Sequence, residues 1–304
     1  MSLTTLRPTS VRILEVGPRD GLQNETNLLS TAVKTAFIEQ LADAGLKSIE
    51  AGAFVDPSWV PQMADAEAVF SQVRRDKGVH YSALVPNESG LERALAAGVD
   101  EVAVFASATE TFSRKNLNRS REQAMVMFKP VVQRAKAAGK RVRAYISMAF
   151  GDPWEGDVPI SDVVRIGQGL LSFGADELCI ADTIGIATPA LVQRVLAALI
   201  ASGIRPDRIA AHFHDTYGQG LANVLASLEL QIETFDASAG GIGGCPYAKS
   251  ATGNLATEDL LWMLEGLGVR TGVDLKTVVE ASTSISRQLG HEPPGRVARA
   301  LAAR

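Results

Sequence analysis

A short apolar run of strand length recurs eight times in the sequence, and stretches with a helical pattern separate most of these runs. The runs cover residues 11–16, 48–51, 80–85, 101–105, 141–147, 177–180, 209–214 and 234–238. Most of them are rich in β-branched or aromatic side chains, which strands favour. Because strands alternate with helices, the sequence predicts a parallel sheet whose strands are joined by right-handed crossovers.

Glycines mark the points at which the predicted helices end. Helical patterns over residues 30–44, 88–97, 121–138, 161–173 and 189–202 are each followed by a glycine. The phrases DAGLKSIE, AAGVDEVAV, AAGKRVRAY and SFGADELCI show the repeated order of helix, glycine and strand. Glycine in this position adopts the left-handed conformation at little steric cost, so it stops a helix. Ser30 is the predicted N-cap of the first helix.

Eight such units fit a closed (β/α)8 TIM barrel, an α/β fold that takes about 250 residues. An open, doubly wound sheet is the alternative, but no dinucleotide-binding glycine fingerprint follows the first run. We therefore expect a barrel catalytic domain over residues 1–270. Residues 271–304 are expected to form a short helical C-terminal extension, with a helix over 274–289, that packs on the barrel or on a partner subunit. The tail over 292–304 contains two prolines and is expected to be partly mobile.

Charge and composition exclude several classes of protein. The formal net charge is −4, so the chain has no basic excess that would favour a nucleic-acid partner. No apolar stretch reaches the roughly 18 residues of a membrane span, and MSLTTLRPTS at the start lacks the apolar segment of a signal peptide. The two cysteines, Cys179 and Cys245, cannot build a disulfide framework, and the reducing cytoplasm fits best.

Polar residues follow the first two predicted strands. Active sites of TIM barrels gather at the carboxyl ends of the strands. Arg19, Asp20 and Gln23 come after the first strand, in GPRDGLQNE. Asp20 is equally explained as a residue of a polar turn or a helix cap. Glu50 ends the second strand, where a buried carboxylate is costly without a partner. The alternative is a glutamate on an edge strand that faces water.

The seventh strand, in AAHFHDTYG, carries two of the four histidines of the chain. His212 and His214 are two residues apart, so both side chains project from one face, which is the interior in a barrel. A single core histidine is usually structural, but a pair at the barrel mouth indicates a metal, since imidazole is the commonest metal ligand. Asp20 would add a hard oxygen. Such a mixture favours Mg²⁺ or Mn²⁺ over a thiolate-bound zinc.

The segment after the eighth strand reads SAGGIGGCPYAKSATGN and has four glycines between residues 240 and 244. It is explained either as a flexible loop or anion cradle, or as a mobile lid that presents Cys245 to the active site. Asn254 offers an amide oxygen. Since the first, seventh and eighth strands of a barrel are neighbours, Asp20, His212, His214 and Asn254 are expected to converge.

Six segments together resemble the 3-hydroxy-3-methylglutaryl-CoA lyase family over nearly the whole chain. They are GPRDGLQNE, FVDPSWVPQMAD, ASATETFSRKNLN, ADTIGIATP, HFHDTYGQGLAN and GGIGGCPYAKSATGN. The resemblance implies a metal-dependent carbon–carbon lyase of leucine degradation and ketone body metabolism. Its acyl-CoA substrate would be cleaved to acetoacetate and acetyl-CoA. Members of the family are commonly homodimers. The wider superfamily includes isopropylmalate synthases and hydroxy-ketoacid aldolases.

The resemblance also implies roles for individual residues. The residues that match the metal ligands are Asp20, His212, His214 and Asn254. The residues that match the remaining active-site groups are Arg19, which binds the substrate carbonyl oxygen, the carboxylates Glu50 and Asp182, the lid cysteine Cys245, and Gln23 and Tyr145, which line the pocket. His212 is also the first candidate for the base, a role that competes with tight ligation of metal. Cys245 is the candidate acid that protonates the acetyl-CoA carbanion.

The chain departs from the family pattern at three places. Gly52 and Ala53 replace a Thr-Ser pair, residues 56–58 read Asp-Pro-Ser instead of Ser-Pro-Lys, and GDPWEG, with Asp152 and Trp154, replaces Gly-Cys-Pro-Tyr-Glu-Gly. These positions are expected to border the substrate mouth, so a related 3-hydroxy-3-alkylglutaryl-CoA is an alternative substrate.

Two other functions stay open from the sequence. One is an acetyl-CoA-dependent synthase or aldolase of the same superfamily, and the other is an inactive barrel that binds metal or acyl-CoA. Lys115, Asn116 and Arg119 are expected either to meet the phosphates of CoA or to form a solvated basic loop.

Overall fold

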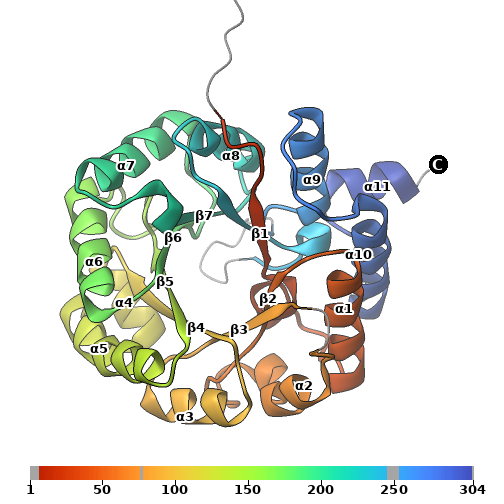
Figure 1. Ribbon diagram of the computed structural model, residues 1–304, viewed down its shortest axis with the longest axis horizontal. Helices are drawn as coiled ribbons and strands as arrows, with labels where there is room; N and C mark the ends of the chain where they lie inside the picture. The colour runs from red at the N-terminus through yellow and green to blue at the C-terminus, as the bar shows by residue number, and fades with distance from the viewer. Residues whose placement is uncertain (1–6, 76–77, 245–252, 303–304) are drawn as a thin grey trace, which may run out of the picture.

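The computed structural model describes residues 7–75, 78–244 and 253–302. Eight parallel strands pair in chain order and close into a barrel through β1 and β8, inside a ring of helices (Figure 1). The strands are β1 (Arg12–Glu15), β2 (Ser48–Ala53), β3 (His80–Leu84), β4 (Glu101–Ser107), β5 (Arg141–Ser147), β6 (Glu177–Asp182), β7 (Ile209–Phe213) and β8 (Thr234–Ala237). The predicted (β/α)8 barrel is confirmed.

All five helices predicted around the barrel are present, with bounds within one or two residues of the prediction. The predicted helices are α1 (Thr31–Asp43), α3 (Glu88–Ala96), α5 (Arg121–Ala137), α6 (Ile160–Phe173) and α7 (Pro189–Ala201). The described residues also form α2 (Ala66–Gln72), α4 (Glu110–Leu117), α8 (Gly220–Leu228), α9 (Thr257–Gly266), α10 (Leu275–Leu289) and α11 (Arg296–Ala302). Helices α2, α4, α8, α9 and α11 were not predicted from the sequence. The first three have seven, eight and nine residues, so each gives only a weak helical period.

Local chemistry explains the ends of these helices. Ser30 caps α1 as predicted, because its hydroxyl accepts a hydrogen bond from the backbone N–H of Val33. Gly174 ends α6 with a φ of 116°, and its N–H reaches the carbonyl oxygens of Leu170 and Leu171. A residue with a Cβ would be strained in this conformation, so the glycine fixes where the chain turns back toward β6.

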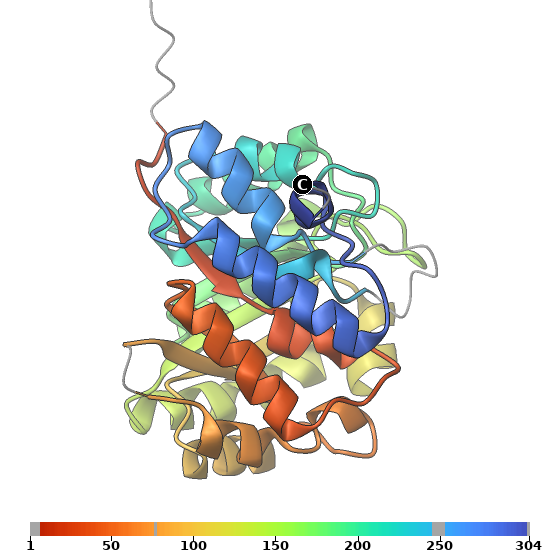
Figure 2. The same ribbon diagram turned by 90° about the vertical axis from the view of Figure 1, so that its right-hand side faces the viewer.

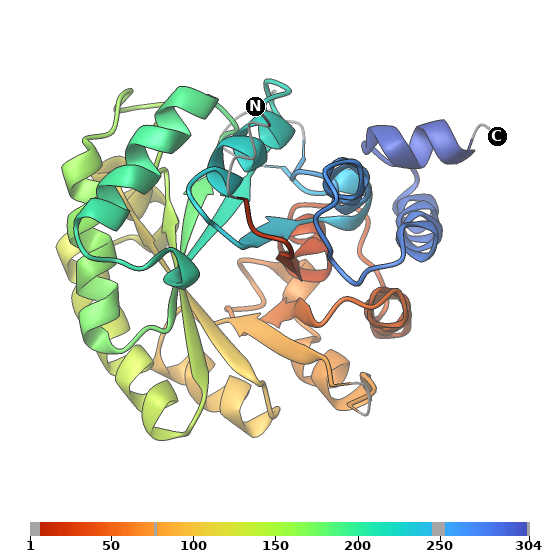
Figure 3. The ribbon, with the colours of Figure 1, turned by 45° about the horizontal axis from the view of Figure 1, so that its top comes forward.

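The C-terminal helices lie on one flank of the barrel. Figures 2 and 3 show α10 side by side with α1, and α11 packs on α9 and α10. Asp259 of α9 accepts hydrogen bonds from the backbone N–H groups of Arg296 and Val297 at 3.1 and 2.7 Å. Residues 296–302 of the tail thus form a helix that is hydrogen-bonded to α9, and the partial mobility of the tail stays a prediction.

No helix within the described ranges has both the length and the apolar character that a membrane span requires.

A buried carboxylate, Glu15 of β1, joins the barrel to the segment after β8. It accepts hydrogen bonds from the N–H groups of Gly17 and Ala239 at 2.8 and 2.9 Å, and from the Thr257 hydroxyl at 2.7 Å. Burial outweighs these hydrogen bonds and raises the pKa of Glu15 to about 7. The folded protein therefore retains a proton here at pH values where the unfolded chain has lost it.

This pKa predicts a pH-dependent stability. The stabilisation that protonated Glu15 gives is full below its ordinary pKa of 4.5 and is lost as the pH rises to about 7. Glu15→Gln cannot ionise, and its amide can satisfy the same partners. We expect this variant to gain up to about 3 kcal/mol over wild type between pH 4 and pH 8. Urea unfolding at both pH values measures this gain, and an identical pH slope in the two proteins would contradict it.

Candidate active site

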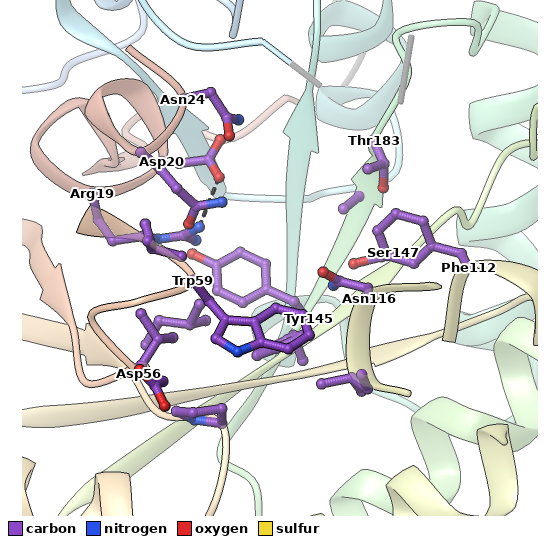
Figure 4. Close-up of a pocket in the computed structure, with 18 of the residues that line it drawn as sticks. Arg19, Asp20, Asn24, Asp56, Trp59, Phe112, Asn116, Tyr145, Ser147 and Thr183 are labelled. Atoms are coloured by element: carbon purple, nitrogen blue, oxygen red, sulfur yellow. Dashed lines mark hydrogen bonds and ion pairs between the residues drawn. The ribbon is translucent and has the colours of Figure 1, made fainter. Parts of the chain in front are cut away.

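A cavity of about 520 Å³ opens at the carboxyl ends of the strands (Figure 4). Its polar lining includes six of the predicted site residues: Arg19, Asp20, Gln23, Tyr145, His212 and His214. Its apolar lining includes Val55, Val60, Leu84, Phe105, Leu117 and Met127. The position is the one at which barrel enzymes bind their substrates.

Arg19 lies between two carboxylates at the pocket. It sits in the short helical turn η1 (Gly17–Gly21), directly after β1. Its Nε donates to Glu50 Oε2 at 2.6 Å and its Nη1 donates to Asp20 Oδ1 at 2.7 Å. Burial lowers the pKa of Arg19, but the charges of Glu50 and Asp20 outweigh it, so the pKa is raised. Arg19 is therefore a fixed cation at the pocket.

Glu50 is completely buried in β2, which rules out the glutamate on a water-facing edge strand. Burial raises the pKa of Glu50, although the Arg19 guanidinium opposes this shift. The Tyr145 hydroxyl donates to Glu50 Oε1 at 3.4 Å, and burial raises the pKa of this phenol well above its ordinary value. Tyr145 thus stays a neutral hydrogen-bond donor beside the carboxylate.

Asp20, His212 and His214 form a candidate metal centre. Each offers one ligand atom, and these three atoms lie within 4.8 Å of one another. Burial disfavours ionised Asp20, but the charges of Arg19, His212 and His214 prevail and lower its pKa to about 2. Burial and then the charge of His212 lower the pKa of His214 to about 4. At neutral pH the carboxylate is ionised and the His214 ring is neutral, as metal ligation requires.

Asn254 completes this cluster. Its Nδ2 donates to Asp20 Oδ2 at 3.0 Å, and a β-bridge pairs it with His214. Within the described part of the chain, Asn254 Oδ1 and His214 Nδ1 are buried without a hydrogen-bond partner. Buried acceptors of this kind need a partner. A divalent cation fits, because a carboxylate oxygen, two imidazole nitrogens and an amide oxygen are all atoms that ligate metals in proteins.

A buried charge network under the pocket holds His212. Asp236 of β8 lies 3.2 Å from His212 Nδ1 through Oδ2, and its Oδ1 accepts from Arg143 Nη2 at 2.6 Å. Burial opposes protonation of His212, but the hydrogen bond and charge of Asp236 raise the pKa of the ring. A carboxylate only accepts, so Nδ1 carries the proton and Nε2 is left for metal or substrate.

Neither Asp236 nor Arg143 was predicted from the sequence. A signal existed for Arg143, because it lies two residues before Tyr145 in β5 and therefore shares its inward face. The pairing with Asp236, 93 positions later in the chain, becomes visible only in the folded barrel.

Asp236→Asn is expected to weaken the site without unfolding the barrel. The amide has one acceptor oxygen for the three donors Arg143, His212 and Cys179, so the His212 ring loses its fixed orientation. We expect Mn²⁺ affinity to fall by about 10–100-fold, the range for groups that orient metal ligands. Isothermal titration with Mn²⁺ measures this loss. Wild-type affinity in a folded Asp236→Asn protein would contradict the orienting role.

The other predicted site residues are Gln23, Cys245 and Asp182. Gln23 lines the pocket, whereas Cys245 is outside the described residues. The Asp182 carboxylate accepts hydrogen bonds at 3.0 Å from the N–H groups of Ile186 and Ala187, so it closes the turn after β6. Burial raises the pKa of Asp182 to about 7. Asp182 also interacts electrostatically with His212.

Of the three residues considered for CoA phosphates, Asn116 and Arg119 are at the pocket. Lys115 instead places its ammonium 5.0 Å from the centre of the Trp154 ring.

The expectation that Gly52 and Ala53 border the substrate mouth is wrong. The register of β2 against β3 shifts between Glu50 and Gly52, and such a bulge changes which side chains face inward. A Cβ on Gly52 would meet Ala66 and Phe70 of α2 at 3.6 Å, on the outside of the barrel. Ala53 is buried in the apolar core, and neither residue is among the described residues that line the pocket.

A closed parallel barrel with a carboxylate, two imidazoles and a buried arginine at its carboxyl end defines a class of protein. It is a (β/α)8-barrel enzyme with a candidate divalent-metal centre. Residues 10–285 match the family model described as HMGL-like. The chain belongs to this family.

Relatives agree over almost the whole chain. A Pseudomonas aeruginosa protein named 3-hydroxy-3-isohexenylglutaryl-CoA/hydroxy-methylglutaryl-CoA lyase is 48% identical, with 98% of this chain and 99% of that protein covered. The crystal structure of hydroxymethylglutaryl-CoA lyase from Pseudomonas aeruginosa has a TM-score of 0.95 at 47% identity, covering 98% and 99% of the two chains. An HMG-CoA lyase from Acinetobacter baumannii, in complex with coenzyme A and 3-methylmalate, has a TM-score of 0.92 at 36% identity, covering 99% and 97%.

Proposed function

We propose that the protein is a carbon–carbon lyase that cleaves 3-hydroxy-3-methylglutaryl-CoA to acetoacetate and acetyl-CoA with bound Mg²⁺ or Mn²⁺. The observation that carries the proposal is the cluster of Arg19, Asp20, His212 and His214 at one pocket, in a chain 48% identical to a lyase of this name. A homodimer in the cytoplasm stays a prediction of the sequence, and sedimentation of the purified protein tests the dimer.

In the cleavage, electrons move from the C3 hydroxyl oxygen through the C2–C3 bond into the thioester. The C3 hydroxyl loses its proton, the C2–C3 bond breaks, and C3 becomes the ketone of acetoacetate. The bonding electrons move to C2 and delocalise into the thioester as an enolate, which takes up a proton to give acetyl-CoA. A divalent cation held by the candidate ligands would act as a Lewis acid toward substrate oxygens.

The residues of the pocket match these needs. Arg19 stabilises the oxygen that becomes negative, because its guanidinium is held by Glu50 and Asp20 before substrate arrives. Asp236 occupies Nδ1 of His212, so Nε2 can either accept the hydroxyl proton or bind the cation, with Glu50 or Asp182 as the candidate relay of the proton. Comparing Mn²⁺ binding with kcat in His212→Ala separates the role of base from that of ligand. Cys245 stays the proposed acid that protonates C2.

The apolar lining of the pocket supports the alternative substrate. Val55, Leu84 and Phe105, from β2–β4 and the segments after them, line the same cavity of about 520 Å³ as the polar residues. The relative from Pseudomonas aeruginosa is named for both a methyl and an isohexenyl substrate. A larger alkyl group at C3 is therefore the second candidate.

Product analysis tests the proposal. The purified protein is incubated with 3-hydroxy-3-methylglutaryl-CoA and Mg²⁺, and acetoacetate and acetyl-CoA are quantified. We expect equal amounts of the two products, at a turnover in the usual range of about 1–10³ s⁻¹. Parallel reactions with acetyl-CoA and 2-keto acids test the synthase and aldolase alternative. Condensation there, with no cleavage of the lyase substrate, would overturn the proposal.

A further inference from the structure

The loop between β5 and α6 makes three contacts to helix α4 and to Thr109, the residue before it. Asp152 Oδ2 accepts a hydrogen bond from the Thr109 hydroxyl at 2.5 Å, and Glu155 Oε1 accepts from the Thr111 N–H at 2.5 Å. The third contact is the Lys115 ammonium over the Trp154 ring. Residues 151–156, called here the clamp loop, thus hold the first turn and the last turn of the same helix.

Asp152 itself is fixed by the clamp loop. Its other oxygen, Oδ1, accepts from the N–H groups of Trp154 and Glu155 at 2.7 and 2.9 Å. Backbone hydrogen bonds of 3.0 and 2.9 Å between Asp152 and Gly156 close the loop. Asp152 is only 3% exposed, and the hydroxyl of Thr109 is one of the three donors to its carboxylate. The Asp152–Thr109 contact is therefore part of a built structure and not a chance surface contact.

Helix α4 depends on contacts of this kind. It has eight residues, and helices this short are not stable alone. Thr109 precedes the helix, yet its side chain makes no hydrogen bond to the helix N-terminus among the described residues, because it points to Asp152 instead. Glu155, in the clamp loop, instead satisfies one of the unpaired N–H groups at the helix N-terminus, because its carboxylate accepts a hydrogen bond from the Thr111 N–H in the first turn.

The position of α4 matters because the helix forms a wall of the pocket. Phe112, Asn116 and Leu117 of α4 line the cavity. Figure 4 shows Phe112 and Asn116 on the side of the pocket opposite Arg19 and Asp20. Phe112 packs in a small apolar cluster with Met148, which follows β5 and leads into the clamp loop. A shift of the clamp loop would therefore move the pocket wall, while the metal centre on the other side stays in place.

We propose that Asp152 and Glu155 are positioning residues: through Thr109 and Thr111 they hold α4 against the pocket and so set the affinity for the acyl-CoA substrate. This inference rests on the proposed function for the identity of the substrate. It assigns a role to Asp152 that does not require Asp152 to touch substrate, in line with its absence from the described residues that line the cavity.

The sharpest test removes the Thr109 hydroxyl without changing the volume of the side chain. Thr109→Val loses the hydrogen bond to Asp152 and the 3.2 Å contact with Ser107 Oγ, whereas Thr109→Ser keeps both. The Ser107 oxygen still accepts from the backbone N–H of residue 109 in both variants. Loss of one buried hydrogen bond corresponds to about a fivefold change in an equilibrium constant. We expect Thr109→Val to raise KM for 3-hydroxy-3-methylglutaryl-CoA by about that factor, with kcat within about twofold of wild type and Mn²⁺ affinity unchanged. Thr109→Ser should restore the wild-type KM.

A second pair of variants tests the same idea at an exposed residue, where folding is not at risk. Glu155→Ala removes the acceptor for Thr111, whereas Glu155→Gln keeps an oxygen in its place. Hydrogen exchange followed by mass spectrometry should show faster exchange over α4 in Glu155→Ala and Thr109→Val only. Unchanged exchange together with unchanged KM would overturn the proposal. A joint loss of kcat and Mn²⁺ affinity would also overturn it, because it would show general damage to the site.

The two proposals fail in different ways. If wild type does not cleave 3-hydroxy-3-methylglutaryl-CoA, the proposed function fails, but coenzyme A alone still serves as a binding probe. In that case Thr109→Val must weaken coenzyme A binding about fivefold relative to Thr109→Ser, and equal binding would overturn the positioning role.

Discussion

Asp20→Asn is expected to abolish metal binding and to lower kcat by about 10³-fold or more, because a bound cation supplies several kcal/mol of charge stabilisation. The substitution is isosteric, but the amide places a donor where Asp20 now accepts from Arg19 Nη1 or from Asn254 Nδ2. It also removes the only carboxylate of the three-residue ligand cluster.

Mn²⁺ titration and steady-state kinetics measure these losses together. Asp207→Asn is a matched control, since Asp207 lies in the short turn η3 (Pro206–Arg208) before β7, at the opposite end of the barrel. The control should keep wild-type metal affinity and turnover. If Asp20→Asn binds Mn²⁺ as wild type does, Asp20 is not a ligand.

Arg19→Met is expected to separate catalysis from metal binding. Loss of a donor aimed at developing negative charge costs about 10²–10³-fold in kcat. Metal affinity should stay the same or increase, because the variant removes a positive charge that lies 2.7 Å from Asp20. The fold should persist, since burial already raises the pKa of Glu50, and the carboxyl can accept a proton when its cation is removed.

Arg19 is identified as a group that acts in the reaction if Arg19→Met loses kcat but keeps its metal affinity, whereas Asp20→Asn loses both. The kinetics of Arg19→Met are measured at saturating Mg²⁺, and folding is checked by circular dichroism and thermal unfolding. Arg205→Met, a substitution of an exposed arginine before β7, is the control and should behave as wild type. A parallel loss of metal affinity and kcat in Arg19→Met would assign Arg19 to the structure of the metal centre instead of to the reaction.

The repeated order of strand, helix and glycine was enough to predict the barrel. Each long helix buries one face and ends at a glycine, so the sequence of the helix itself contains both its period and its stop signal, as in α6 and Gly174. The short helix α4 lacks this information, because contacts from a distant loop hold it in place. Its existence could not be predicted from the pattern alone.

The candidate site was predictable where strand ends carry unusual residues, as at Asp20, His212 and His214. The sequence left Glu50 open between a buried and an exposed position, and only the pairing with Arg19 decides it. The prediction for Gly52 failed because a bulge in β2 turns it toward α2. Asp236 was missed, since a carboxylate that orients a histidine resembles any other strand residue until the barrel closes.

The central claim is that a divalent cation at Asp20, His212, His214 and Asn254 supports cleavage of 3-hydroxy-3-methylglutaryl-CoA. The most direct test is acetyl-CoA release by the wild-type protein after EDTA treatment and gel filtration, followed by titration with Mg²⁺ or Mn²⁺. We predict that activity disappears and returns as one cation binds per chain. Full turnover by a protein shown by elemental analysis to hold no metal would contradict the account.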